Sequence, residues 1–136
     1  MNHSRREPSP ELDAVAREVI GAAIEVHRAL GPGFRESIYE ESLCVELSFR
    51  GISFARQVPV HIEYRGHQVG QSQVDLVVAG QLIVELKSVP QLLPIYVAQV
   101  ISYLKAFRQP LGLLINFHVP LLQAGIRRIV LSSICG

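Results

Sequence analysis

The spacing of apolar residues predicts two helices at the start of the chain. Hydrophobic side chains recur every three or four residues through residues 9–30 and again through residues 35–49. Ser9 precedes the first of these runs and is expected to cap the helix. Gly31-Pro32-Gly33 separates the two helices, and Gly51 marks the end of the second.

Shorter apolar runs predict five strands and one further helix. Residues 54–64 alternate between apolar and polar side chains, and Pro59 within them indicates an edge position or a bulge. Residues 111–117 are almost entirely apolar, which is typical of a strand covered on both faces. The predicted fold is therefore α/β, a mixed β-sheet flanked by helices in the order αα-βββ-α-β-β. The remaining elements are a strand that follows a turn at residues 65–67 and continues to residue 79, a strand over residues 82–88, a helix over residues 95–107 and a strand over residues 126–131.

The segment from Val74 to Ser88, VDLVVAGQLIVELKS, contains the most informative part of the pattern. Two short apolar strands meet at a turn, and a loop of Ala79-Gly80-Gln81 would place Asp75 directly opposite Glu85. Lys87 lies two residues after Glu85 and so projects from the same face of the sheet. The opposite face is expected to point into the core and carries Val74, Leu76, Val78, Leu82, Val84 and Leu86.

Two carboxylates that face each other across a ladder repel, and burial would raise the pKa of at least one of them. The pair is explained if a positive group lies between them. That group could be Lys87 or a hard divalent cation, which prefers carboxylate oxygens. The alternative is a salt bridge on a half-exposed hairpin. The choice of lysine favours the metal, because the chain uses Arg eleven times and Lys twice, and one of those two lysines is Lys87.

The distribution of charge divides the chain into two halves. Residues 1–85 contain all twelve acidic residues and eight arginines, whereas residues 86–136 contain five basic residues and no acid. A polyanion would be held by the second half, while carboxylates of the first half bind cations. A solvated basic surface is the other explanation, since the net charge of the whole chain is only +1.

Length and composition predict a single domain. The chain has 136 residues, of which 49% are hydrophobic, and its mean hydropathy is +0.27. We expect residues 1–8 to be a disordered tail and residues 9–136 to form one domain. The high apolar content is compatible with a homodimer. No apolar run reaches the roughly 18 residues that span a bilayer, and Cys44 and Cys135 form no metal motif, so a cytoplasmic location is expected.

Taken together, these residues resemble the PD-(D/E)XK nuclease superfamily, and within it the small GxxExxY proteins. The naming motif is present as Gly33-Phe34-Arg35-Glu36-Ser37-Ile38-Tyr39. It is joined by DLVVAGQLIVELKSV, by AQVISYL, which contains Gln99 and Tyr103, and by GLLINF. The similarity extends over about residues 26–131, although Val74 stands where the superfamily's name has Pro. It implies a restriction-endonuclease-like fold and metal-dependent cleavage of phosphodiester bonds.

The resemblance also implies a role for each site residue. Asp75 and Glu85 would bind Mg²⁺ or Mn²⁺, and Glu36 would complete or support that metal site. Lys87 would orient the attacking water or stabilise charge at the scissile phosphate, while Gln99 and Tyr103 would approach the site and the substrate strand. The expected partner is nucleic acid, with DNA favoured over RNA. The alternatives are a catalytically weak or inactive nucleic-acid-binding module with this fold, or a homodimeric interaction protein.

Overall fold

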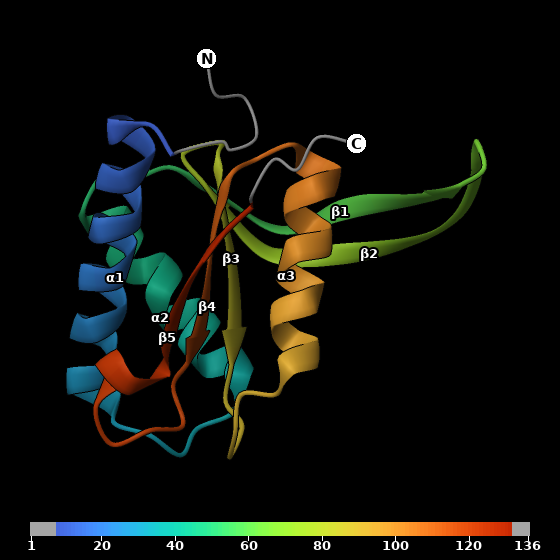
Figure 1. Ribbon diagram of the computed structural model, residues 1–136. Helices are drawn as coiled ribbons and strands as arrows, with labels where there is room; N and C mark the ends of the chain where they lie inside the picture. Colours follow the sequence, from blue (N-terminus) through green and yellow to red (C-terminus); the bar gives the residue numbers. More distant parts are fainter. Residues whose placement is uncertain (1–7, 132–136) are drawn as a thin grey trace.

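The computed structural model describes residues 8–131 (Figure 1). Within that range the chain forms three α-helices, one short 3₁₀ helix and five strands, in the predicted order αα-βββ-α-β-β. The elements are α1 (Pro10–Leu30), α2 (Glu36–Phe49), β1 (Phe54–Tyr64), β2 (His67–Val78), β3 (Leu82–Lys87), α3 (Pro94–Phe107), β4 (Leu111–Asn116), η1 (Leu122–Gly125) and β5 (Ile126–Val130).

The strands form one mixed sheet in the order β1-β2-β3-β4-β5. β3 and β4 pair in parallel, with α3 as the crossover between them, and the other neighbouring strands are antiparallel. β1 lies at an edge of the sheet, one of the two positions that Pro59 indicated. All six residues of β4 are buried, which confirms that this strand is covered on both faces.

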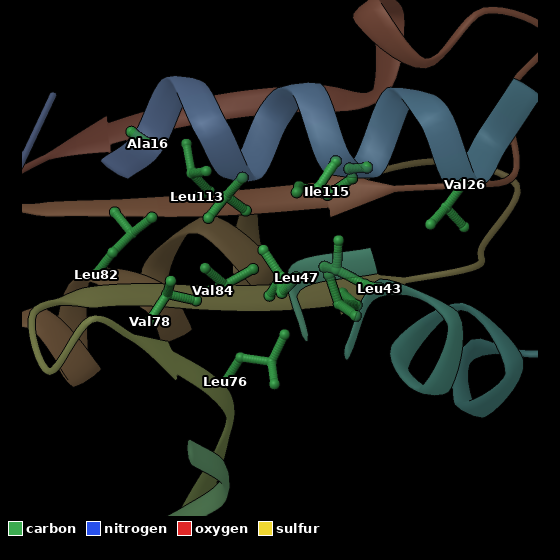
Figure 2. Close-up of a cluster of buried hydrophobic side chains, with 14 of the residues drawn as sticks. Ala16, Val26, Leu43, Leu47, Leu76, Val78, Leu82, Val84, Leu113 and Ile115 are labelled. Carbon is green, nitrogen blue, oxygen red and sulfur yellow. The ribbon is translucent and has the colours of Figure 1, made fainter. Parts of the chain in front are cut away.

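Helices cover both faces of the sheet and create two apolar layers. The larger layer lies between the sheet and the helices α1 and α2, and Figure 2 shows side chains from these helices meeting those of the strands. The smaller layer lies between the sheet and α3, and includes Val100 and Leu104 from the helix and Ile83 and Leu114 from the strands. The sheet is thus the middle layer of an α/β sandwich.

Local sequence signals define the ends of the first helix. Ser9 caps α1 as predicted, because its Oγ accepts a hydrogen bond from the Leu12 amide at 3.1 Å. Gly31 follows the helix with φ of +70°, a conformation that favours glycine. Val19, Ala22 and Ala23 on the inner face of α1 are fully buried, so packing against the sheet stabilises the helix in addition to its N-terminal cap.

The turn between β2 and β3 sets the predicted register, but the ladder is shorter than expected. Ala79 and Gly80 both have positive φ, and the pairs Val78–Leu82 and Leu76–Val84 form as predicted. Pairing then stops, so Asp75 and Glu85 are not the ladder pair that the sequence suggested. β3 pairs with β4 on its other edge both before and beyond this point, from Ile83 to Lys87.

β2 also changes face at Asp75, which corrects the prediction for Val74. Val74 packs in the layer next to α3, whereas Leu76 packs in the layer next to α1 and α2. Residues two apart on a regular strand share a face, so alternation is broken between them. The neighbouring strand is irregular at the same point, because Gln57 has φ of +49° and the Gln57–Asp75 pair is missing from the β1–β2 ladder.

The distal half of the β1–β2 hairpin extends beyond α3 (Figure 1), and its residues 61–71 are exposed. No helix within residues 8–131 has the length and apolar character needed to cross a membrane. The predicted tail, apart from Pro8, and Cys135 lie outside the described residues. Cys44 is buried, and burial raises the pKa of its thiol to about 11.

Candidate functional site

Asp75 and Glu85 bridge the two strands at the point where the β2–β3 ladder ends. The Asp75 amide donates a hydrogen bond to Glu85 Oε2 at 2.7 Å, and the Leu86 amide donates one to Asp75 Oδ2 at 2.9 Å. Each carboxylate therefore satisfies a backbone N–H of the opposite strand that the ladder no longer pairs. In this crossed pair each carboxylate binds the backbone of the other strand, so the two carboxyl groups are held close together between β2 and β3.

The surroundings of Asp75 and Glu85 disfavour the ionisation of both carboxyl groups at once. Burial, followed by the nearby Asp75 carboxylate, raises the pKa of Glu85 to about 8, against the opposing effects of the Asp75 amide and Lys87. Burial also raises the pKa of Asp75, although the Leu86 amide counteracts this. A bound cation would relieve the cost of ionising both groups, because an opposite charge favours the ionised form.

Glu36 lies in the first turn of α2 and is electrostatically coupled to this pair. Burial raises the pKa of Glu36, and the charge of Asp75 raises it further, while Lys87 opposes the shift. Its position depends on Tyr39, one turn along the same helix. The Tyr39 hydroxyl donates to the Gly31 carbonyl at 2.5 Å and accepts from the Phe34 amide at 3.2 Å. Tyr39 thereby fixes the loop of residues 31–35, which directly precedes Glu36.

Lys87, the last residue of β3, lies beside the helix α3. Its Nζ is 4.8 Å from the centroid of the Tyr96 ring, which is a cation–π contact. Lys87, Tyr96 and Gln99 line the same open depression of about 380 Å³, together with Ser102. The structure thus brings Lys87 and Gln99 to one surface, and the charge of Lys87 also acts on the carboxyl groups of Asp75 and Glu85.

Tyr103 is placed differently from Gln99, although it follows one turn later on α3. Its side chain is buried at 4% exposure, and its hydroxyl is 2.9 Å from Ser72 Oγ on β2. Tyr103 therefore joins α3 to β2, and it does not line the depression that contains Lys87 and Gln99.

The structure adds three residues near Asp75 and Glu85 that the sequence patterns did not identify as site residues. Glu40 of α2 is 7% exposed, and Arg56 of β1 binds it through Nε at 3.2 Å and Nη2 at 3.1 Å. Gln57 donates through Nε2 to Glu40 at 3.0 Å and to Asp75 at 3.4 Å. Glu40 shares a helix face with Glu36 by its spacing of four residues, which was the one signal in the sequence.

The donor chemistry of the site fits a hard divalent cation. Glu85 Oε1 accepts no hydrogen bond within residues 8–131, and each Asp75 oxygen keeps acceptor capacity beyond the bonds described above. The arrangement does not include a complete ligand set: across residues 8–131, no three His, Cys, Asp or Glu side chains are grouped closely enough to hold a metal ion. Asp75 and Glu85 are the crossed pair whose oxygens could bind one, and within these residues they form no group of three with Glu36.

A family model and a solved structure both resemble this chain in a way that agrees with its observed fold. The model of the PD-(D/E)XK nuclease superfamily matches residues 13–129. Among solved structures, the crystal structure of SSO0001 superposes with a TM-score of 0.50 at 16% sequence identity, covering 93% of this chain. The chain spans 61% of the length of that protein, and at this identity the likeness concerns the fold alone. A search of curated proteins finds no match.

The five-stranded mixed sheet flanked by helices, with paired carboxylates where the β2–β3 ladder ends, defines a restriction-endonuclease-like α/β protein. Because the family model covers most of its length, the chain belongs to the PD-(D/E)XK nuclease superfamily.

Proposed function

We propose that this protein is a Mg²⁺- or Mn²⁺-dependent nuclease that cleaves phosphodiester bonds, with DNA as its favoured substrate. The observation that carries the proposal is the crossed pair Asp75 and Glu85, with Lys87 two residues further along β3. Burying two carboxyl groups that repel each other costs folding free energy, and the backbone hydrogen bonds that they accept offset only part of that cost. Superfamily membership supports the same chemistry, since nucleases of this superfamily typically use divalent metals.

Each site residue has a proposed role, which the position of its side chain supports. Asp75 and Glu85 hold the cation, which when bound supplies a Lewis acid and lowers the pKa of a coordinated water. Glu36 supports this pair from the start of α2. Lys87 presents a compact positive charge to the phosphate, where negative charge grows in the transition state. Gln99 orients the substrate strand from the depression that it shares with Lys87.

Tyr103 acts in this proposal by positioning α3 against β2 through Ser72. We further propose that the chain belongs to the GxxExxY group. Its motif has a physical basis here, because Tyr39 secures the glycine-containing loop that precedes Glu36. Glu36 and Tyr39 of this motif are three residues apart on α2. Glu36 is coupled to the carboxylate pair, and Tyr39 is buried in the core.

Cleavage assays test this proposal directly. The wild-type protein is incubated with single- and double-stranded DNA and RNA in Mn²⁺, beside Lys87→Ala prepared in the same way. We expect metal-dependent cleavage by the wild type and a loss of about 100-fold or more in Lys87→Ala, the range seen when a group that stabilises transition-state charge is removed. Equal activity in both preparations would indicate a contaminating nuclease and would refute the proposal.

The absence of a third grouped ligand among the described residues 8–131 favours a second candidate, a nuclease-fold module that binds nucleic acid without cleaving it. Calorimetric titration with Mn²⁺ separates the two functions. A nuclease gives a binding heat that Asp75→Asn abolishes, whereas the module binds nucleic acid in a chelator and gives no Mn²⁺ heat.

A further inference from the structure

Gln57 lies where the regular structure of β1 is interrupted. Its φ of +49° is in the left-handed region, which is uncommon and strained for a residue such as glutamine. The pairs on either side, Arg56–Leu76 and Val58–Val74, belong to the ladder, and the pair between them does not. Strain that is kept inside a strand indicates that the side chain it presents has a role.

The Gln57 amide bridges two acids. Nε2 donates to Glu40 Oε1 at 3.0 Å and to Asp75 Oδ1 at 3.4 Å. Ionised carboxylates only accept hydrogen bonds, so the nitrogen of the amide faces them, and its two hydrogens match the two acceptors. The neutral Gln57 amide can therefore donate a hydrogen bond to each of the two carboxylates without adding a charge to the site.

Glu40 provides the fixed end of this bridge. It is buried within α2, and Arg56 binds its Oε2 through two nitrogens while also reaching Glu41 at 2.8 Å. Asp75 is consequently held from two directions. Its Oδ1 is tied through Gln57 to α2, and its Oδ2 accepts the Leu86 amide of β3.

We propose that Gln57 is a positioning residue for the divalent-cation site, orienting the Asp75 carboxylate through a hydrogen bond anchored on Glu40. This inference rests on the proposed function, because it assigns Gln57 to the same site. Groups that orient a metal ligand affect metal affinity about 10- to 100-fold when they are removed. A residue that only joined β1 to α2 would affect folding instead.

Two substitutions distinguish positioning from a folding role. Gln57→Met keeps the length of the side chain and the strained backbone but removes both hydrogens. Gln57→Gly removes the side chain and relieves the strain, because glycine adopts positive φ freely. Ala79→Gly is the matched control, since Ala79 has φ of +52° at a turn that carries no site residue.

Mn²⁺ affinity by calorimetry and the melting temperature without metal are measured for all four proteins. We expect both Gln57 variants to bind Mn²⁺ about 10- to 100-fold more weakly, with Gln57→Gly melting at the higher temperature of the two, and Ala79→Gly to bind like the wild type. Unchanged affinity in Gln57→Met, or affinity that follows melting temperature across the two variants, overturns this inference while the proposed function stands. Absence of Mn²⁺ binding by the wild type overturns both.

Discussion

The ring of Tyr39 stacks on the ring of Phe117, with centroids 4.4 Å apart and planes inclined by 10°. Both side chains are fully buried, so this contact joins α2 to the end of β4 in the larger apolar layer. The same tyrosine holds the loop before Glu36 through its hydroxyl. One residue thus couples the core of the protein to the edge of the proposed site.

Tyr39→Phe should keep the stacked ring and lose the loop contacts. The Gly31 carbonyl loses its donor, and we expect the free energy of unfolding to fall by about 1 kcal/mol. Tyr39→Ala should cost about 3–5 kcal/mol, because it also leaves a cavity beside Phe117. Urea denaturation measures both, and a Tyr39→Phe variant as stable as the wild type would show that the hydroxyl contacts contribute nothing.

The stability of the metal-free protein should depend on pH through Glu85. Its pKa rises from 4.5 in the unfolded chain to about 8 in the folded chain, so the folded state binds the proton more tightly between these values. Stability therefore falls as pH rises from about 4.5 to 8, by on the order of 5 kcal/mol at most. Unfolding in urea with a chelator at several pH values measures the slope.

Glu85→Gln is the control for that measurement. The amide oxygen still accepts the Asp75 N–H but cannot ionise, so the variant should lose most of the decline between about pH 4.5 and 8. A decline of the same size in Glu85→Gln would assign the pH dependence to other groups.

Substitutions of Asp75 should separate its structural role from its charge. Asp75→Ala leaves the Leu86 amide without its acceptor, and we expect a loss of about 1–3 kcal/mol in unfolding free energy. Asp75→Asn keeps one acceptor for the Leu86 amide and removes the repulsion with Glu85, but its NH2 then faces the Gln57 amide, so without metal it should lose less stability than Asp75→Ala. Equal losses in the two variants would contradict the crossed hydrogen bonding.

Tyr96 should influence activity through Lys87. Tyr96→Phe keeps the ring beneath the ammonium group, whereas Tyr96→Leu removes the cation–π contact. We expect cleavage by Tyr96→Leu to fall about threefold to tenfold, in line with the strength of such contacts, and Tyr96→Phe to act like the wild type. The contact is irrelevant to the reaction if both variants cleave at the wild-type rate.

The sequence was sufficient to predict the order of elements and most of the hairpin. Ser9 and Ala79-Gly80-Gln81 are local signals, and they acted locally as predicted. The end of the ladder after Leu76–Val84 was not predictable from alternation. At that point the Asp75 and Glu85 side chains accept the backbone N–H groups of the opposite strand, and these side-chain bonds leave no mark in the alternation.

The surroundings of the site were harder to predict for the same reason. Gln57 carries no glycine or asparagine signal for its positive φ, which is stabilised by contacts with Glu40 and Asp75 from distant parts of the chain. Glu40 is buried because Arg56, sixteen residues later, neutralises it. Such long-range partners leave no periodic trace, so only the three-dimensional structure reveals them.

Crystals soaked with Mn²⁺ test the central claim most directly. The account predicts an anomalous difference peak between Asp75 and Glu85, with carboxylate oxygens of both as ligands at about 2.0–2.6 Å, the range of Mg²⁺ and Ca²⁺ sites. A peak bound by other residues, or none between these two carboxylates at saturating Mn²⁺, would contradict it.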